Sequence, residues 1–493
     1  MKRRNGAVSL FAFTLGILML LTACSGGGGN ESTETTAVTA RSDTAVEYPG
    51  EIVRPRSAEQ AAKALEGLET LNFDGAATVI ATYSHADILC PESAADEISA
   101  AALARNRAIE KKYNTTIAGK LAGSREALLD EVRTSVKAGL YYADIIAIDI
   151  SEIGSYNADS LLMNLYSLPD FDPNSDIFNT DAMSQLSAAF RSYGVVSAAT
   201  EDVRDIYAVY WNKAIAESLG AGDLYGEYER GEWTWQRFSV LMHSAAEARG
   251  ADKATRIGAV TDLPLNEVAD AMQISSGLHY VSTEYGSVPS ISYDDAAMNE
   301  LAALAYTVFG NGQGFSSGYG SDTSAATSFR GGDVLFYVGT FRDAETLASA
   351  ESDWGVLPLP SYSEQTSGIT AMSPSSAVLV TPRSNALGEN TSAVLKALSL
   401  ASSGVMDDAV IEYLTVSSLR DNASVRMVRA AAEKTARTDF TAAFPSISAL
   451  QNATAEAYHN VIKSGGRFSS AANRYFRNGT SALNQNFPLK NAE

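Results

Sequence analysis

The run Ala143-Asp144-Ile145-Ile146-Ala147-Ile148 decides the fold class of this chain. Its nearly continuous apolar character is typical of a strand that is buried on both faces, as strands are in parallel sheets. The pattern before it predicts a helix that begins at Ser124, a residue suited to cap a helix N-terminus, and that stops before Gly139. A helix followed by a doubly buried strand favours an α/β fold.

The same alternation of strands and helices continues on both sides of this run. Residues 76–83 form a β-branched run, and residues 97–113 carry apolar side chains at helical spacing. Open α/β sheets bind ligands at the carboxyl ends of their strands, so we expect a site in the loops after Tyr83, Ile148, Val338 and Met372. Further strands are predicted near residues 205–209, 334–338, 356–357 and 377–380, with helices between them and a helical region from about residue 403 onward.

Length and charge limit the function further. The chain has 493 residues, of which 45% are hydrophobic and 19% are charged, and its net charge is −21. A single core seldom grows beyond about 250–300 residues, so we expect at least two lobes or domains. The acidic surface repels phosphate backbones and anionic lipids, which argues against nucleic-acid binding and against adsorption to a membrane surface. Two cysteines, Cys24 and Cys90, cannot make a disulfide framework or a four-thiolate metal site, and we expect no cofactor and no metal.

The N-terminus predicts export and a lipid anchor. A positive segment, residues 2–4, precedes an uncharged stretch, residues 7–23, that is too short and too one-sidedly flanked for a transmembrane helix. The stretch ends at Cys24 and resembles the bacterial lipobox, in which the cysteine thiol becomes a lipid-bearing thioether. Residues 1–23 are therefore predicted to be a lipoprotein signal peptide. An ordinary signal peptide with an incidental cysteine is the alternative.

After this cysteine the composition changes to Gly, Ser, Thr, Glu and Asn, as far as about Gly50. A segment with so little apolar surface cannot bury a core, so it is predicted to be a flexible tether. We assign residues 24–70 to the lipid-anchored cysteine and the tether. The folded body is then expected on the extracytoplasmic face of the cell membrane, held there by lipid alone.

Seven segments share the order and the character of motifs from one protein family. They are residues 105–114, 142–146, 210–213 (YWNK), 231–235 (GEWTW), 329–341, 355–360 (GVLPLP) and 419–424 (LRDNAS). In this order they resemble the extracellular solute-binding proteins, family 1, of ATP-driven importers, the group of maltose-binding protein. Two positions depart from the family pattern, because Gln236 stands where an acid is usual and Gly368 lies where a tyrosine of the ligand wall is common.

The resemblance implies a two-lobed, periplasmic-binding-protein-like α/β fold, with hinge strands and a central cleft that closes on a ligand. It assigns residues 71–204 and 355–403 to an N-lobe, and residues 205–354 and 404–493, the latter helical, to a C-lobe. It also implies a monomeric receptor, and no enzyme, that delivers a carbohydrate such as an oligosaccharide to the permease subunits of an ABC transporter. A receptor for another solute, such as a peptide or a polyamine, is the nearer alternative.

Aromatic side chains able to stack on a sugar ring come from three segments. Phe341 lies two positions after Gly339, where the resembling maltose-binding segment carries a stacking tryptophan. Tyr210 and Trp211 lie at the predicted hinge, and because side chains alternate along a strand, at most one of them faces the cleft.

Two tryptophans flank Thr234, the predicted N-cap of a helix. Trp235 begins a stripe of apolar residues at positions i, i+3 and i+7, which places it in the core. Trp233 is therefore the better candidate for the cleft. Core packing is the alternative role for every aromatic candidate.

Polar candidates lie next to the predicted strand ends. The hydroxyl groups of a sugar need directional hydrogen-bond partners of this kind. For each of them the alternative role is to cap a helix or to stabilise a loop. The candidates are Ser84 and His85 after the first strand, Asp149 and Ser151 after the second, and Ser375 and Ser376 before the strand at residues 377–380.

Two other motifs suggest different chemistry. Residues 314–318 match the hydrolase elbow G-x-S-x-G around Ser316, but they lie in a Gly/Ser loop, and His459 is the only histidine downstream. Residues 170–181 have acidic side chains at the spacing of a calcium loop, but Ser175 stands where that loop needs a glycine. We expect a solvated acidic loop at this place, and a lipid-anchored hydrolase is the less favoured function.

Overall fold

The computed structural model describes residues 57–247, 257–310, 314–322, 324–363, 366–385 and 388–489. The predicted signal peptide, Cys24 and most of the predicted tether lie outside these residues. The tether was expected to reach residue 70, but Ser57–Ala64 forms helix α1. This helix packs on α3 (Glu97–Tyr113), and Ala61 and Leu65 are buried. Apolar contacts with the folded body therefore order the end of the predicted tether.

The first lobe is built on a four-stranded sheet with the order β14-β3-β1-β2. β1 (Ala77–Thr82), β2 (Thr116–Leu121) and β3 (Ile145–Asp149) run parallel, and β14 (Ala377–Val380) joins β3 antiparallel. The residues from Ile145 to Ile148 are completely buried, so the prediction of a doubly buried strand is confirmed.

Helix α4 (Arg125–Ala138) confirms both predicted ends. The Ala127 N–H donates to the Ser124 hydroxyl over 3.2 Å, which caps the N-terminus. Gly139 closes the other end in the left-handed conformation, with a φ of 66°. α3 and α14 (Gly388–Ser402) pack on each other and on this sheet.

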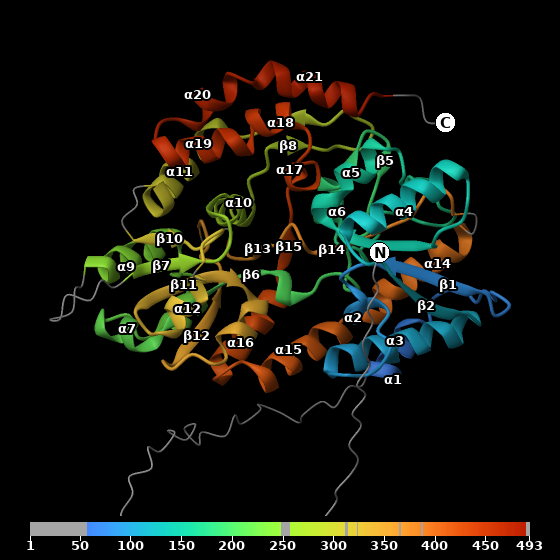
Figure 1. Ribbon diagram of the computed structural model, residues 1–493, viewed down its shortest axis with the longest axis horizontal. Coiled ribbons are helices and arrows are strands. Elements are labelled where there is room, and N and C mark those ends of the chain that lie inside the picture. Colours follow the sequence, from blue (N-terminus) through green and yellow to red (C-terminus); the bar gives the residue numbers. More distant parts are fainter. Residues whose placement is uncertain are drawn as a thin grey trace, which may run out of the picture. The chain divides into compact units, whose positions relative to one another are not determined.

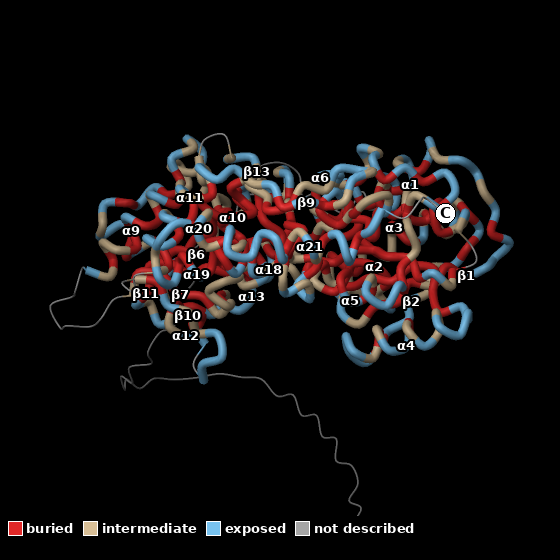
Figure 2. The backbone as a smooth tube through the Cα atoms, turned by 90° about the horizontal axis from the view of Figure 1, so that it is seen from above, coloured by how far each residue is buried: buried red, intermediate tan, exposed pale blue. Residues whose placement is uncertain are grey.

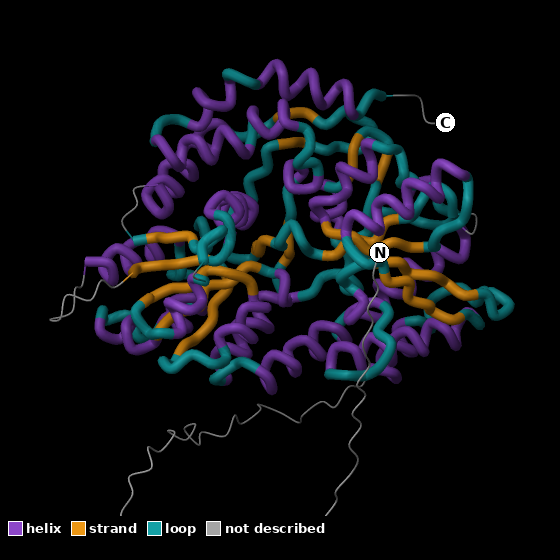
Figure 3. The backbone as a smooth tube through the Cα atoms, viewed as in Figure 1, coloured by secondary structure: helices purple, strands orange, loops and turns teal. Residues whose placement is uncertain are grey.

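The second lobe contains a five-stranded sheet with the order β10-β7-β11-β6-β12. β10, β7 and β11 pair in parallel, whereas β6 runs antiparallel to both β11 and β12. Figure 3 shows the two groups of strands in orange. The strands are β10 (Phe315–Ser317), β7 (Ile257–Thr261), β11 (Val334–Thr340), β6 (Tyr207–Asn212) and β12 (Trp354–Pro358). The helices packed on them are α9 (Trp235–Glu247), α12 (Ala325–Arg330) and α16 (Asn422–Ala432).

The chain passes from the first sheet to the second at η3 (Val203–Asp205), next to the predicted boundary. The return comes later than predicted. β12 pairs with β6, so residues 355–358 belong to the second sheet and not to the first lobe. Between the two sheets, β13 (Ile369–Ala371) pairs in parallel with β15 (Thr435–Arg437), as Figure 1 shows.

Helix α15 (Val405–Ser417) also departs from the predicted division, which placed residues 404–493 in the C-lobe. It packs on α3 of the first lobe as well as on α16 of the second, because its buried apolar face is shared between them. The later helices α18 to α21 pack on one another and on α10, α11 and β9 of the second lobe.

The remaining elements are short helices, turns and two-residue strands. No helix in the described ranges is both long and apolar enough to cross a bilayer. The elements are α2 (Ala86–Leu89), η1 (Ile150–Glu152), α5 (Ile153–Ala158), η2 (Leu165–Ser167), α6 (Thr180–Gln185), β4 (Ser187–Ala188), β5 (Arg191–Ser192), α7 (Lys213–Ser218), α8 (Leu224–Glu229), α10 (Leu265–Ser275), β8 (Val281–Ser282), β9 (Ser290–Ile291), α11 (Asp295–Ala305), the π-helical η4 (Tyr306–Gly310), η5 (Phe341–Asp343), α13 (Ala344–Leu347), α17 (Phe440–Ala443), α18 (Ser448–Ala453), α19 (Ala455–Ser464), α20 (Phe468–Asn473) and α21 (Phe476–Asn486).

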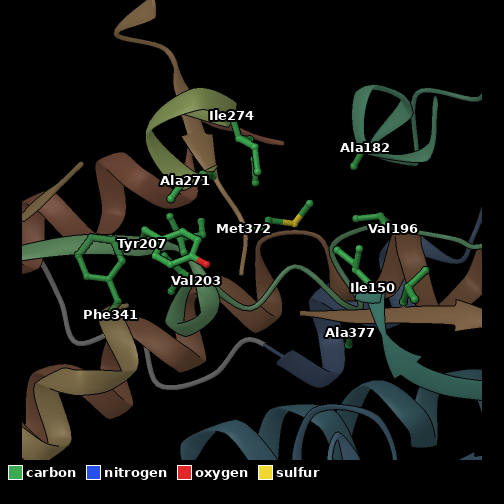
Figure 4. Packing of buried hydrophobic residues seen from close by; sticks show 14 of the residues in the cluster. Ile150, Ala182, Val196, Val203, Tyr207, Ala271, Ile274, Phe341, Met372 and Ala377 are labelled. Atoms are coloured by element: carbon green, nitrogen blue, oxygen red, sulfur yellow. The ribbon is translucent and has the colours of Figure 1, made fainter. Parts of the chain in front are cut away.

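Buried residues lie in both lobes and also in the region between them, as the red parts of the tube show in Figure 2. Met372, next to β13, lies between Ile274 of the second lobe and Val196 of the first (Figure 4). Tyr48–Glu493 forms one compact unit by its internal contacts, and every contact described below lies within it.

Candidate ligand-binding site

The four loops in which a site was expected line one cavity, with a volume of about 380 Å³. The cavity therefore lies where the strand ends predicted it. Its lining consists of Tyr83, Ser84 and His85 after β1, Asp87 and Ile88 of α2, Asp149 at the end of β3, Asp202 and Asp205 around η3, Arg342 after β11, and Ser375 before β14.

Strand register explains why these residues meet. β1 and β3 are parallel, so their carboxyl ends share one edge of the first sheet. β14 is antiparallel to β3 with Ala377 opposite Asp149, which brings Ser375 to the same edge. In the second sheet Thr340 is opposite Tyr207, and the same antiparallel register, continued by two residues, sets Arg342 against Asp205.

The first-lobe wall of the cavity is held by hydrogen bonds and ion pairs. The side-chain oxygen of Thr82 accepts from the backbone N–H groups of Ser84 and His85, over 3.3 and 3.1 Å. His85 Nε2 lies 2.9 Å from Asp149 Oδ1. Arg125 lies behind them, 3.5 Å from the second carboxylate oxygen of Asp149. The imidazole and the carboxylate are therefore oriented before any ligand arrives.

Glu152 stabilises this wall through contacts with Arg125 and Tyr83. Its carboxylate is 3.0 Å from Arg125 Nε and accepts a hydrogen bond of 3.0 Å from the Tyr83 hydroxyl. Burial is the largest cause that raises the pKa of Glu152, and burial also raises the pKa of Tyr83, so that phenol stays protonated. The Tyr83 ring is thereby fixed at the cavity edge.

The hinge side of the cavity is a chain of alternating charges. Arg342 Nη2 lies 2.5 Å from Asp205 Oδ1 and 3.5 Å from Asp202 Oδ2. Arg204 Nη2 lies 2.6 Å from Asp202 and 2.8 Å from Asp87 of α2. These contacts connect the first lobe, the hinge and the start of η5 in a single network.

The two hinge aspartates differ in acidity. Burial, followed by the charge of Asp202, raises the pKa of Asp205 to about 6, although Arg342 opposes this rise. Burial also disfavours the charged form of Asp202, but Arg204 outweighs it and holds the pKa of that carboxyl below its usual value. Asp205 thus titrates in mildly acidic solution.

The aromatic candidates lie elsewhere. Phe341, Tyr210, Trp211 and Trp233 each expose at most 1% of their surface. Trp233 Nε1 donates to the Pro358 carbonyl over 3.0 Å, and the Tyr210 hydroxyl donates to the Thr340 carbonyl over 2.9 Å. Figure 4 shows Phe341 beside Tyr207 in the apolar packing. In this conformation these rings fill the core of the second lobe and have no surface with which to stack on a ligand.

Some of the polar candidates line the cavity, and the others have structural contacts or are buried. Ser84, His85, Asp149 and Ser375 line the cavity, as described above. Ser151 accepts a hydrogen bond of 2.7 Å from Arg125. Ser376 is fully buried. Trp235 is buried as well, so its prediction as a core residue is confirmed.

Four charged lining residues were absent from the sequence-based candidates: Asp87, Asp202, Asp205 and Arg342. Asp202 lies just before a predicted strand and Asp205 lies at its start, in the segment Asp202-Val203-Arg204-Asp205, whose alternating charges were a usable signal. Arg342 directly follows Phe341, and only the strand register shows which of these two side chains faces the cavity.

A second, larger cavity of about 580 Å³ lies away from the strand ends that line the first. It is bordered by residues 176–181 of the predicted acidic loop, by the end of α14 and by residues 433–435. Asp181 of that loop pairs with Arg437 at 3.1 Å. Within the described part of the chain, no group of three or more His, Cys, Asp or Glu residues is placed to hold a metal ion.

The hydrolase motif lacks its required geometry. Ser316 lies inside β10, whereas a nucleophile elbow places the serine on a sharp turn between a strand and a helix. His459 is buried in α19, with Nε2 2.7 Å from Asp270 Oδ1. The two residues therefore have separate structural roles.

Comparisons with known proteins give a clear result for the fold. No family model matches the sequence, and no curated protein matches it. Among solved structures, the chain is similar to the sugar-binding protein MalE from Xanthomonas citri, with a TM-score of 0.54 and 12% identity, over 83% of this chain and 98% of that one.

Two further structures match to a similar extent. The first is the galacto-N-biose/lacto-N-biose I-binding protein of the ABC transporter from Bifidobacterium longum, with a TM-score of 0.52 and 12% identity, over 84% of this chain and 98% of that one. The second is UgpB from Mycobacterium tuberculosis in complex with glycerophosphocholine, with a TM-score of 0.50 and 16% identity, over 83% and 99%. At these identities the likeness shows a shared fold.

Proposed function

We propose that this chain, whose fold is that of the extracellular solute-binding proteins of sugar ABC transporters, captures a carbohydrate and delivers it to a permease. One observation carries the proposal: a single cavity is lined by strand-end loops of the first lobe, by the hinge and by Arg342 of the second lobe. A solute there contacts both lobes only when they are closed, so binding favours the closed state.

The chemistry of the lining supports a carbohydrate. Aspartate carboxylates, two serines, a histidine and an arginine offer directional partners to hydroxyl groups. Tyr83 adds an aromatic side chain to the lining, and aromatic rings pack on the C–H groups of sugars. The volume of about 380 Å³ is within the usual range for small-molecule sites, which is about 300–1,000 Å³.

The proposed location follows from the N-terminal sequence. A lipid on Cys24 and a tether without a core hold the folded body outside the cell membrane, next to the permease subunits. Dual acylation is sufficient for stable anchoring without a membrane-spanning helix. The body itself acts as a monomeric receptor.

A non-sugar solute is the second candidate, and one observation favours it. The similar protein UgpB was solved with glycerophosphocholine, so this fold also holds a ligand that is not a saccharide. A peptide or a polyamine belongs to the same class of alternative.

The test is a titration of the Tyr48–Glu493 unit with a panel of oligosaccharides, glycerophosphocholine, spermidine and short peptides. We expect saturable heat of binding for a saccharide, together with a smaller radius of gyration in X-ray scattering and no product. If only a non-sugar solute binds, the second candidate function, a receptor for a non-sugar solute, would replace the proposed carbohydrate receptor. Turnover of a ligand, or no binding by any member of the panel, would contradict the receptor.

A further inference from the structure

We infer that, if the proposed receptor function holds, its solute is a sugar that carries a free amine. The cavity contains four carboxylates, those of Asp87, Asp149, Asp202 and Asp205. Arg342 and His85 are the basic residues among its lining. A site of this composition differs from one built for a neutral sugar, because its lining places far more negative charge than positive charge against the ligand.

The residues directly behind the lining reduce this imbalance but do not remove it. Arg204 pairs with Asp202 and Asp87, and Arg125 pairs with Asp149. Arg125 also pairs with Glu152, which adds a further carboxylate. Even with a positive charge on His85, the network has five carboxylates and four cations. The network is therefore negative without a ligand.

The hinge shows how this site holds a cation. The Arg342 guanidinium lies between Asp205 and Asp202, at 2.5 and 3.5 Å. This position is already filled by the protein itself. Burial, followed by the negative charge of Asp202, raises the pKa of Asp205, and Arg342 opposes this rise.

Two carboxylates of the cavity, those of Asp87 and Asp149, can still be reached by a ligand, although each also has a basic partner. Arg204 lies 2.8 Å from Asp87, and His85 lies 2.9 Å from Asp149. Asp87 exposes 43% of its side chain and Asp149 exposes 14%. Both line the cavity together with His85 and the hydroxyl-bearing Ser84. An ammonium group near Asp87 and Asp149 completes the charge balance, while the hydroxyl groups of the same sugar bond to the serines and the histidine.

The matched probes are the glucosamine disaccharide with two free amines and its N,N′-diacetyl counterpart. Acetylation keeps the rings and removes the charge, so the pair isolates the contribution of the ammonium groups. We expect the free amine to bind the Tyr48–Glu493 unit at least tenfold more tightly at pH 7 and low salt, with an advantage that shrinks as salt is added.

The outcomes separate this inference from the proposed function. Equal or tighter binding of the acetylated sugar, or of neutral oligosaccharides, would contradict the inference of a free amine but not the proposed receptor function. Binding of spermidine without binding of any sugar would contradict both the inference of an amino sugar and the proposal that the solute is a carbohydrate. Binding of none of the probes, including the earlier panel, contradicts the receptor itself.

Variants locate the ammonium group. Asp87→Asn removes one charge at the exposed side of the cavity, and we expect the preference for the free amine to fall about tenfold with little change for the acetylated sugar. Asp149→Asn keeps the contact to His85 and serves as a second variant if Asp87→Asn does not fold. Asp172→Asn, on the exposed loop that follows Asp170, is the control and should leave both affinities unchanged. Equal losses for both sugars in Asp87→Asn and Asp149→Asn would overturn the assignment.

Discussion

Gly286 and Ala189 belong to different lobes, and the Gly286 N–H donates a hydrogen bond of 2.7 Å to the Ala189 carbonyl. The contact joins the β8–β9 hairpin to the β4–β5 hairpin. Beside it, the ring of Tyr285 lies 4.6 Å from Tyr166 and 5.6 Å from Phe190, between centroids. Gly286 has a φ of +83°, and an added Cβ would lie 3.2 Å from the Phe190 ring. The lobes are thus held together by protein contacts at this edge.

The first prediction concerns this aromatic contact. In Tyr285→Ala both ring contacts are lost, and each aromatic pair contributes about 0.5–1.5 kcal/mol. Because Tyr285 is 62% exposed, we use the lower part of that range and expect the ratio of open to closed molecules to rise about fivefold. X-ray scattering of the ligand-free Tyr48–Glu493 unit should then give a larger radius of gyration.

Tyr319→Ala is the matched control. Tyr319 is 68% exposed and lies in the second lobe, after β10. Its removal should leave the radius of gyration unchanged. If Tyr285→Ala and Tyr319→Ala scatter alike, the aromatic contact does not hold the lobes.

The second prediction concerns Arg342. In Arg342→Gln the buried carboxylates of Asp205 and Asp202 lose their contact with the Arg342 cation. Breaking a fully buried pair costs about 3–5 kcal/mol, but Arg342 is 46% exposed, so we expect a loss of about 2 kcal/mol in the free energy of unfolding at pH 8. Urea unfolding measures this loss, which should be smaller at pH 5 because Asp205 is then protonated. A loss that is the same at both pH values would count against the ion pair.

The third prediction uses the pKa of Asp205, which is raised to about 6 in the folded chain. In the unfolded chain an aspartate titrates near pH 3.9. Between these two values the folded state binds more protons, so the contribution of Asp205 to stability is full below about pH 4 and is lost as the pH rises to about 6. Asp205→Asn should abolish this loss.

Thermal unfolding from pH 4 to pH 7 tests the prediction. The difference in stability between Asp205→Asn and the parent should shift in favour of the variant as the pH rises, by an amount on the order of 2 kcal/mol. Asp176→Asn, in the exposed acidic loop, is the control and should follow the parent at every pH. A difference that is constant with pH would mean that Asp205 does not titrate in this range.

Much of the fold could be predicted because it depends on local patterns. The apolar composition of the run from Ile145 to Ile148 is enough to predict that it is buried. Ser124 and Gly139 mark the ends of α4, because a serine side chain can cap a helix and a glycine readily adopts the left-handed conformation. The edge that bears the cavity follows from the direction of parallel strands. None of these inferences requires knowledge of a distant partner.

The features that sequence reasoning missed depend on such partners. The segment Gly355-Val356-Leu357-Pro358 reads as a strand, but only its pairing with β6 assigns it to the second sheet. Phe341 and Arg342 are neighbours in the sequence, and the register with η3 decides that the arginine faces the cavity while the ring is buried. Aromatic character alone favoured Phe341, whereas Arg342 is the member of this pair that lines the described cavity.

Trp233 offers a direct test of this distinction between core and cleft. In the structure its ring packs on Phe336, with 5.7 Å between centroids, and its Nε1–H is bonded to the Pro358 carbonyl. Trp233→Phe removes that hydrogen bond from a buried carbonyl and leaves a small void, so we expect a loss of about 2–3 kcal/mol in stability. Trp354→Phe is the matched control, because Trp354 is equally buried and donates to the Leu347 carbonyl over 3.1 Å. Both variants should bind the solute within about twofold of the parent. If Trp233→Phe alone binds the solute at least tenfold more weakly, at unchanged stability, Trp233 contacts the ligand and is not a core residue.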